Sequence, residues 1–213
     1  MVLRCSLTFA FAISALGGPV WAAPQAGLIS PSWELNIQFY DPQRITVQTN
    51  SGTETYWYVV YRVTNRTGKD VRFFPFFRIV TNTLQVVDAG DGVHPSAYDL
   101  IAARHRQEFP FFAPPVKVTG LILQGAANAR ESAAVFKTFD PDASSFKVYM
   151  GGLAGEKLRV NNTAFDPSKD ESEDNPRSFL VQRTLEVSYD LPGDRETRAV
   201  ARPVRRDRQW VMR

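Results

Sequence analysis

Cysteine and histidine are scarce in this sequence of 213 residues, which contains one of the first and two of the second. The only cysteine, Cys5, lies near the N-terminus, so the chain cannot form an intramolecular disulfide and its remainder offers no thiolate nucleophile. A Ser-His-Asp triad would need His94 or His105 as its base, and no Gly-x-Ser-x-Gly motif is present. These absences argue against hydrolases with a serine or cysteine nucleophile, and they exclude a blue-copper site.

An apolar run long enough to span a membrane, which takes about 20 residues, is also missing. The run at residues 7–16 is shorter. Arg4 precedes it, and the helix-breaking residues 17–19 follow it. This order, completed by the small residue Ala22, is typical of a secretory signal peptide. We predict a signal peptide over residues 1–22, cleavage after Ala22, and export to the periplasm or cell surface.

Arginine is unevenly distributed along the chain. Residues 195–213 contain seven arginines against Glu196 and Asp207, a net charge of +5. Residues 23–194 carry 17 basic and 20 acidic side chains, a net charge of −3. We predict residues 195–213 to be a disordered basic tail that is attracted to an anionic envelope surface. Nucleic acid is not an expected partner, because an exported protein rarely meets it.

Alternation of apolar and polar residues recurs between turn-forming residues. It is strongest over residues 55–65, where Trp57, Val59, Tyr61 and Val63 fall on one face. Further strands are predicted over residues 33–39, 44–48, 71–81 with an interruption at Pro75, 84–87, 116–123, 133–139, 146–150, 157–160 and 179–189. This pattern predicts a mainly-β fold, a single immunoglobulin-like β-sandwich over residues 23–194.

One segment departs from the alternation. Ser96 and Asp99 have the spacing of a helix capping box, and helical periodicity continues to about Gln107. We predict one short helix inserted between strands, with His105 solvated in its last turn. Residues 166–176 are polar and acidic, and they are predicted to form a mobile loop.

Residues 56–68, Tyr-Trp-Tyr-Val-Val-Tyr-Arg-Val-Thr-Asn-Arg-Thr-Gly, resemble a strand of exported immunoglobulin-like domains in bacterial envelopes. More narrowly, the chain is similar to an uncharacterised family of exported, planctomycete-type envelope proteins through residues 88–93, the helix that follows, and residues 151–156. The resemblance implies a β-sandwich outside the cytoplasm. It implies no active site.

Asp88, Asp91 and His94 recur at steps of three residues, and Asp99 follows them. Carboxylate and imidazole side chains can bind a metal, so these four residues are candidate ligands. The alternative is a glycine-rich turn whose aspartates accept hydrogen bonds from their own backbone, and the sequence favours the turn. No cofactor is expected.

Two segments, residues 73–77 and 109–112, are rich in phenylalanine. Either both faces of these segments are buried, or they expose an apolar patch for a protein partner.

These observations favour a non-catalytic exported module of the envelope with a binding or structural role. Two alternatives stay open. One is an enzyme with a shallow carboxylate or metal site in the loop 88–99, and the other is a subunit of an envelope assembly that uses the phenylalanine-rich segments as its interface. The enzyme requires Asp88, Asp91, His94 and Asp99 to converge on a pocket.

Overall fold

The computed structural model describes residues 32–50 and 52–213. The predicted signal peptide, its cleavage site and Cys5 lie outside the described residues. Within the described residues, no helix is long and apolar enough to cross a membrane.

The first sheet is built around the longest apolar strand, β3 (Gly52–Thr64). β1 (Asn36–Phe39) and β2 (Gln43–Thr49) follow one another along one edge of β3, and β8 (Arg130–Lys137) pairs with its other edge. All three pairings are antiparallel. β3 therefore occupies the centre of a four-stranded sheet.

The second sheet has the strand order β6-β5-β9-β11-β12, and β10 pairs with the part of β11 that β9 does not reach. Its strands are β5 (Phe76–Thr81), β6 (Val86–Asp88), β9 (Ser145–Gly151), β10 (Lys157–Asn161), β11 (Ser178–Asp190) and β12 (Val204–Met212). A separate ribbon pairs β4 (Val71–Phe73) with β7 (Gly120–Ile122). Pro75 lies between β4 and β5, where the sequence predicts an interruption.

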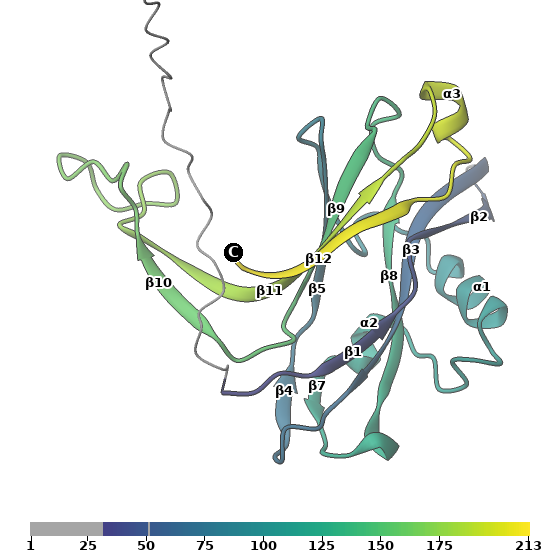
Figure 1. Cartoon of the computed structure of the whole chain (residues 1–213), viewed down its shortest axis with the longest axis horizontal. Helices are drawn as coiled ribbons and strands as arrows, with labels where there is room; N and C mark the ends of the chain where they lie inside the picture. Colours follow the sequence, from purple (N-terminus) through teal and green to yellow (C-terminus); the bar gives the residue numbers. More distant parts are fainter. Residues whose placement is uncertain (1–31, 51) are drawn as a thin grey trace, which may run out of the picture.

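The two sheets pack face to face, as Figure 1 shows. Trp57, Val59, Tyr61 and Val63 are buried together in the core between the sheets, as the alternation predicts. The two packed sheets, with one short helix inserted between strands, confirm the predicted mainly-β sandwich.

The opposite face of β3 is buried as well. Tyr56, Tyr58 and Val60 pack beneath α1 (Ser96–Arg104), whose Ala97 and Ile101 contact them in a second core. This burial explains why β3 has apolar residues on both faces, since only a strand covered on both sides needs them.

Two local predictions are corrected. Residues 116–123 do not form one strand, because Pro115 begins the helical turn α2 (Pro115–Val118) and only Gly120–Ile122 pair as β7. Proline suits the first position of a helical turn, where its missing N–H is not needed. The predicted capping box at Ser96 does not form either: the Ser96 N–H donates to Nδ1 of His94, and the helix ends at Arg104.

The predicted disordered tail is wrong. After the short helix α3 (Arg195–Arg198), Val204–Met212 form β12, which pairs with β11 from Asp190 to Arg183. Arg44 holds the intervening turn, since its guanidinium donates to the carbonyls of Arg198 and Ala201.

Carboxylates on neighbouring elements compensate the charge of β12. Arg205 pairs with Asp41 at 2.5 Å, and Arg206 pairs with Asp190 at 2.5 Å. Long arginine stems can also cover apolar surface while the charged head stays in water. A count of arginines therefore does not distinguish a solvated tail from an edge strand.

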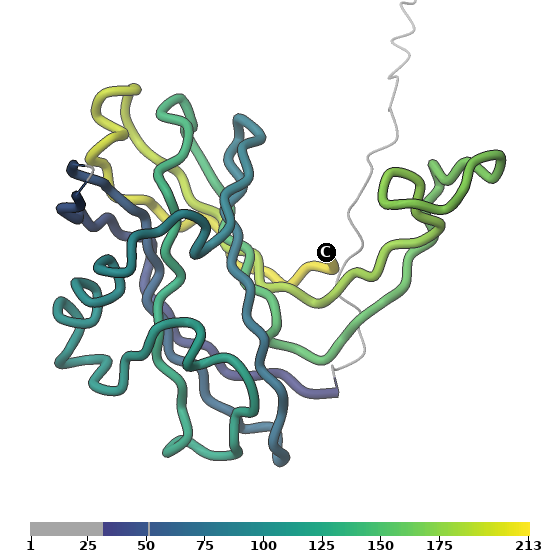
Figure 2. Tube along the Cα trace, turned by 180° about the vertical axis from the view of Figure 1, so that it is seen from behind, coloured from purple at the N-terminus to yellow at the C-terminus, as the bar shows by residue number. Residues whose placement is uncertain are grey.

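A two-stranded arm leaves the body of the sandwich (Figures 1 and 2). The arm, residues 157–182, consists of β10, the first residues of β11 and the loop between them. At its base, Gly152 adopts a φ of +79° where the Phe74 carbonyl approaches it closely, a position that excludes a larger side chain. Gly155 lies against the Trp33 indole in the same region. Close backbone packing thus fixes the point where the arm begins.

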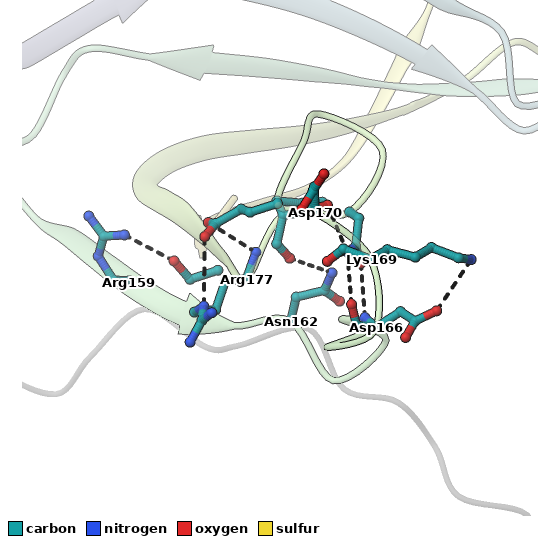
Figure 3. A network of polar contacts seen from close by, with 10 residues as sticks. Arg159, Asn162, Asp166, Lys169, Asp170 and Arg177 are labelled. Carbon is teal, nitrogen blue, oxygen red and sulfur yellow. Dashed lines mark hydrogen bonds and ion pairs between the residues drawn. The ribbon is translucent and has the colours of Figure 1, made fainter.

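The acidic loop at the tip of the arm folds into hydrogen-bonded turns, and its predicted mobility stays a prediction. Buried Asn175 organises it: the side-chain amide donates to the carbonyls of Asp166 and Asp170, and Oδ1 accepts the Asp166 N–H. Figure 3 shows this network together with the Lys169–Asp166 ion pair. The tip is a set of hydrogen-bonded turns.

Candidate functional site

The four candidate metal ligands do not converge. Asp88, the last residue of β6, forms a two-point ion pair with Arg78, at 2.6 Å and 2.9 Å. Asp91 and Asp99 are exposed, and the His94 N–H donates to the Tyr56 hydroxyl. Among residues 32–50 and 52–213, no three carboxylate or histidine side chains are grouped so that they could hold a metal ion.

A cavity of about 520 Å³ lies where the two sheets separate along the β5–β8 side of the sandwich. We call it the Tyr61 pocket. It is lined by Tyr61 of β3, Phe76, Phe77 and Arg78 of β5, Tyr98 of α1, Ala133 and Ala134 of β8, Pro75, Asp88, Ala89, Gly90, Pro115 and Thr119. Residues distant in the sequence therefore share one cavity.

Local packing explains the pocket. Tyr61 stacks on Phe77 with ring centroids 4.7 Å apart, which bridges the two sheets at the rear of the cavity. The Gly90 N–H donates to the Val135 carbonyl, so the loop after β6 crosses to β8 and closes one side.

The polar groups of the pocket are two tyrosines and one ion pair. Burial raises the pKa of Tyr61, an effect that the Ser132 hydroxyl partly offsets, and burial also raises the pKa of Tyr98. Both hydroxyls are therefore neutral at physiological pH. Tyr61 is buried against Ser132, so the half-buried Tyr98 is the tyrosine that can exchange hydrogen bonds with a ligand. At the rim, the hydrogen bond with Asp88 raises the pKa of Arg78. The pocket therefore combines apolar walls with a hydroxyl and an ion pair that can bind polar groups of a ligand.

A second cleft, of about 560 Å³, lies at the other side of the sandwich between β1 and β12. We call it the arginine cleft; it is lined by Ile37, Gln38, Phe39, Tyr40, Arg62, Glu108, Phe109, Arg205 and Arg208. Arg62 pairs with buried Glu131 at 2.6 Å, and Arg205 pairs with Asp41. The guanidinium of Arg208 lies over the Phe39 ring, 5.5 Å from its centroid. Most of the positive charge in this cleft is thus already compensated.

His105 is buried, which corrects the prediction of a solvated histidine. Its Nε2 is 2.9 Å from the Tyr58 hydroxyl, which also donates to Gln43. Burial lowers the pKa of His105, and the charge of Arg104 lowers it further. The four-residue spacing between Ile101 and His105 indicates this burial, because it places His105 on the same helix face as the buried Ile101.

The phenylalanine-rich segments serve mainly the cores. Phe73, Phe77 and Phe109 are buried, whereas Phe74 and Phe111 are exposed. The expectation that both faces of these segments are buried is therefore wrong at Phe74 and Phe111, and a protein partner for the exposed rings stays a prediction.

No protein-family model, curated protein or solved structure matches the chain. Its function is inferred from the geometry of its own pockets.

Proposed function

We propose that this protein is an exported, non-catalytic binding module that holds a small amphipathic ligand in the Tyr61 pocket. The observation that carries the proposal is the combination of apolar walls, the half-buried neutral Tyr98 and a rim ion pair around one cavity. Its volume falls in the range of small-molecule sites, about 300–1,000 Å³, which are typically apolar with a few convergent polar groups.

The lining defines the chemistry of the ligand. An aromatic or branched apolar group contacts Phe76 and Pro115, and a hydroxyl or amide group bonds to Tyr98. An anionic group at the other end meets Arg78 at the rim, where it competes with Asp88. The ligand class is therefore a small molecule with an apolar body and an acidic end.

Two observations favour binding over catalysis. Of the four residues that the enzyme alternative requires, only Asp88 lines the pocket, and Arg78 already binds its carboxylate. Tyrosines whose pKa is raised are poor general bases at neutral pH. Neither histidine of the sequence lines the pocket.

Export is the second part of the proposal. It is supported by the pattern of residues 1–22, in which a positive residue, an apolar run and a small residue follow in order. Mass spectrometry of the protein isolated from the envelope or medium of its host is expected to give an N-terminus at Ala23. An intact Met1 in that fraction contradicts cleavage.

The pocket is tested with one probe and two tryptophan variants of the same turn. Thr119 is exposed and lines the pocket, whereas Lys117 is exposed on α2 and does not line it. The probe is 8-anilinonaphthalene-1-sulfonate, an aromatic anion, titrated by calorimetry. We expect Thr119→Trp to weaken binding about tenfold or more by filling the mouth, while Lys117→Trp binds as the wild type does.

Circular dichroism checks that both variants are folded. Equal affinities of all three proteins, or no binding by the wild type, contradict the pocket as the ligand site.

A further inference from the structure

The arm carries an apolar face that residues 32–50 and 52–213 leave partly exposed. Leu158 lies opposite Val181, and Val160 lies opposite Phe179, so these four side chains share one face of the two-stranded ribbon. Leu158 and Phe179 are 51% and 48% exposed. The other face carries Lys157, Arg159, Leu180 and Gln182. The arm is therefore amphipathic.

This apolar face continues the core face of the second sheet. Along β11, Phe179 and Val181 have the same parity as Leu185, Val187 and Tyr189, which are buried in the sandwich. In the body, the first sheet covers that face. Figures 1 and 2 show that the arm extends past the first sheet. The arm thus has the inner face of a sandwich without its opposing layer.

The arm also has opposite charges at its two ends. The tip, residues 162–177, carries five carboxylates against Lys169 and Arg177, a net charge of −3. The base and shaft carry Lys157, Arg159, Arg183 and Arg213 against Glu34 and Glu156, a net charge of +2. Only an antiparallel arrangement of two arms brings each acidic tip to a basic base, because a parallel arrangement places the two tips together.

We propose that two copies of this chain dimerise through their arms. The apolar faces cover each other about a two-fold axis, and each tip lies against the base of the other arm. Each arm then supplies the layer that the other lacks, and the same patch is used on both copies, as closed two-fold symmetry requires. Within each tip, Asn175 exchanges two hydrogen bonds with the backbone of Asp166 and so joins the two ends of the acidic loop.

The size of the arm sets the expected affinity. Five residue pairs at about 3.3 Å each give a paired ribbon about 17 Å long, so the interface falls at the low end of specific interfaces. We therefore expect a micromolar dimer that weakens with salt, since charged groups at the rim are screened. This inference is independent of the Tyr61 pocket.

The test is sedimentation velocity of the purified protein across the micromolar range. The wild type is expected to pass from monomer to dimer as concentration rises. Phe179→Asp places a charge in the apolar face and is expected to weaken the dimer about tenfold or more. The matched control is Leu180→Asp on the opposite face of the same strand, which is expected to leave the dimer intact.

A charge variant tests the orientation of the arms and does not depend on the apolar face. Glu173→Lys with Asp174→Lys reverses charge at the tip, and it is expected to weaken the dimer at low salt but not at high salt. A wild type that stays monomeric at every concentration overturns the proposal. So does an equal loss in Phe179→Asp and Leu180→Asp, or a tip variant that dimerises normally at low salt.

Discussion

The two halves of β11 share one alternation but differ in their surroundings. Residues 183–190 lie between β12 and the β9 side of the sheet, and their inward side chains Leu185, Val187 and Tyr189 are buried. Residues 178–182 pair with β10 and overhang the body, and their apolar side chains are half exposed. The alternation specifies which side chains share a face. Only the tertiary structure decides whether a second layer covers that face.

The difference has an energetic consequence. Burying a large apolar side chain contributes about 1.5–3 kcal/mol relative to leaving it exposed. The inner half of β11 therefore stabilises the fold, while the outer half keeps most of that free energy available for a partner. Variants in the two halves of β11 can therefore be compared by their effect on stability.

The largest expected effect comes from truncation after Asp194, which removes β12. The inner half of β11 then loses its pairing from Arg183 to Asp190 and the packing of Trp210 on the core. We expect the truncated chain to lose cooperative urea unfolding. Replacing residues 159–180 of the arm by a short turn is the matched control, and it is expected to leave the unfolding midpoint nearly unchanged. If both proteins unfold like the wild type, β12 is not part of the stable sandwich.

A smaller effect is expected from single truncations in the two halves. Leu185→Ala leaves a cavity in the buried core and is expected to cost about 2–5 kcal/mol of unfolding free energy. Leu180→Ala, at a side chain that is 62% exposed, is expected to cost less than about 1 kcal/mol. Urea denaturation measures both. Similar losses would show that the two halves do not differ in their contribution to stability.

The smallest effect concerns pH. Burial opposes ionisation of Glu186 in the inner half, but hydrogen bonds from Lys147, Gln209 and Tyr149 together outweigh it and lower its pKa. The folded state thus binds fewer protons than the unfolded state near the ordinary pKa of glutamate. Stability from this group is present above that pKa, about 4.3, and is lost as pH falls below it.

Glu186→Gln is therefore expected to flatten the acid limb of the stability curve, measured by urea unfolding at a series of pH values. Glu173→Gln at the exposed arm tip serves as the control and is expected to retain the wild-type limb. An unchanged limb in Glu186→Gln would show that the cluster with Lys147 and Gln209 does not favour the ionised carboxylate.

Much of the sandwich follows from local pattern. Alternation around Trp57 identifies the buried face of β3, and Pro75 marks the break between two strands. The sequence does not predict β12, because an arginine-rich segment is compatible both with a solvated tail and with a strand. In the strand, neighbouring carboxylates such as Asp41 and Asp190 pair with the arginines. Its pairing with β11 depends on a partner strand that no local window of sequence contains.

The candidate site was predictable only in part. The loop that begins at Asp88 does border the pocket, but its chemistry is an ion pair with Arg78 rather than metal ligation. Tyr61 and Tyr98 carry no sequence signal for a pocket, since a tyrosine on a buried strand or helix looks like any other core residue. Their shared cavity arises from strands and helices that meet only in the folded chain.

The late position of β12 in the chain also bears on how the protein folds. Its Arg205 binds Asp41 across a separation of 164 residues, so this contact forms only after nearly all of the sandwich has been synthesised. Contacts of such long separation slow folding, because much of the chain must be ordered before they close. Until β12 pairs, the inner half of β11 presents an unpaired edge, the kind of surface on which partly folded β proteins aggregate. The unfolded or partly folded chain is therefore expected to be most prone to aggregation before this last strand closes.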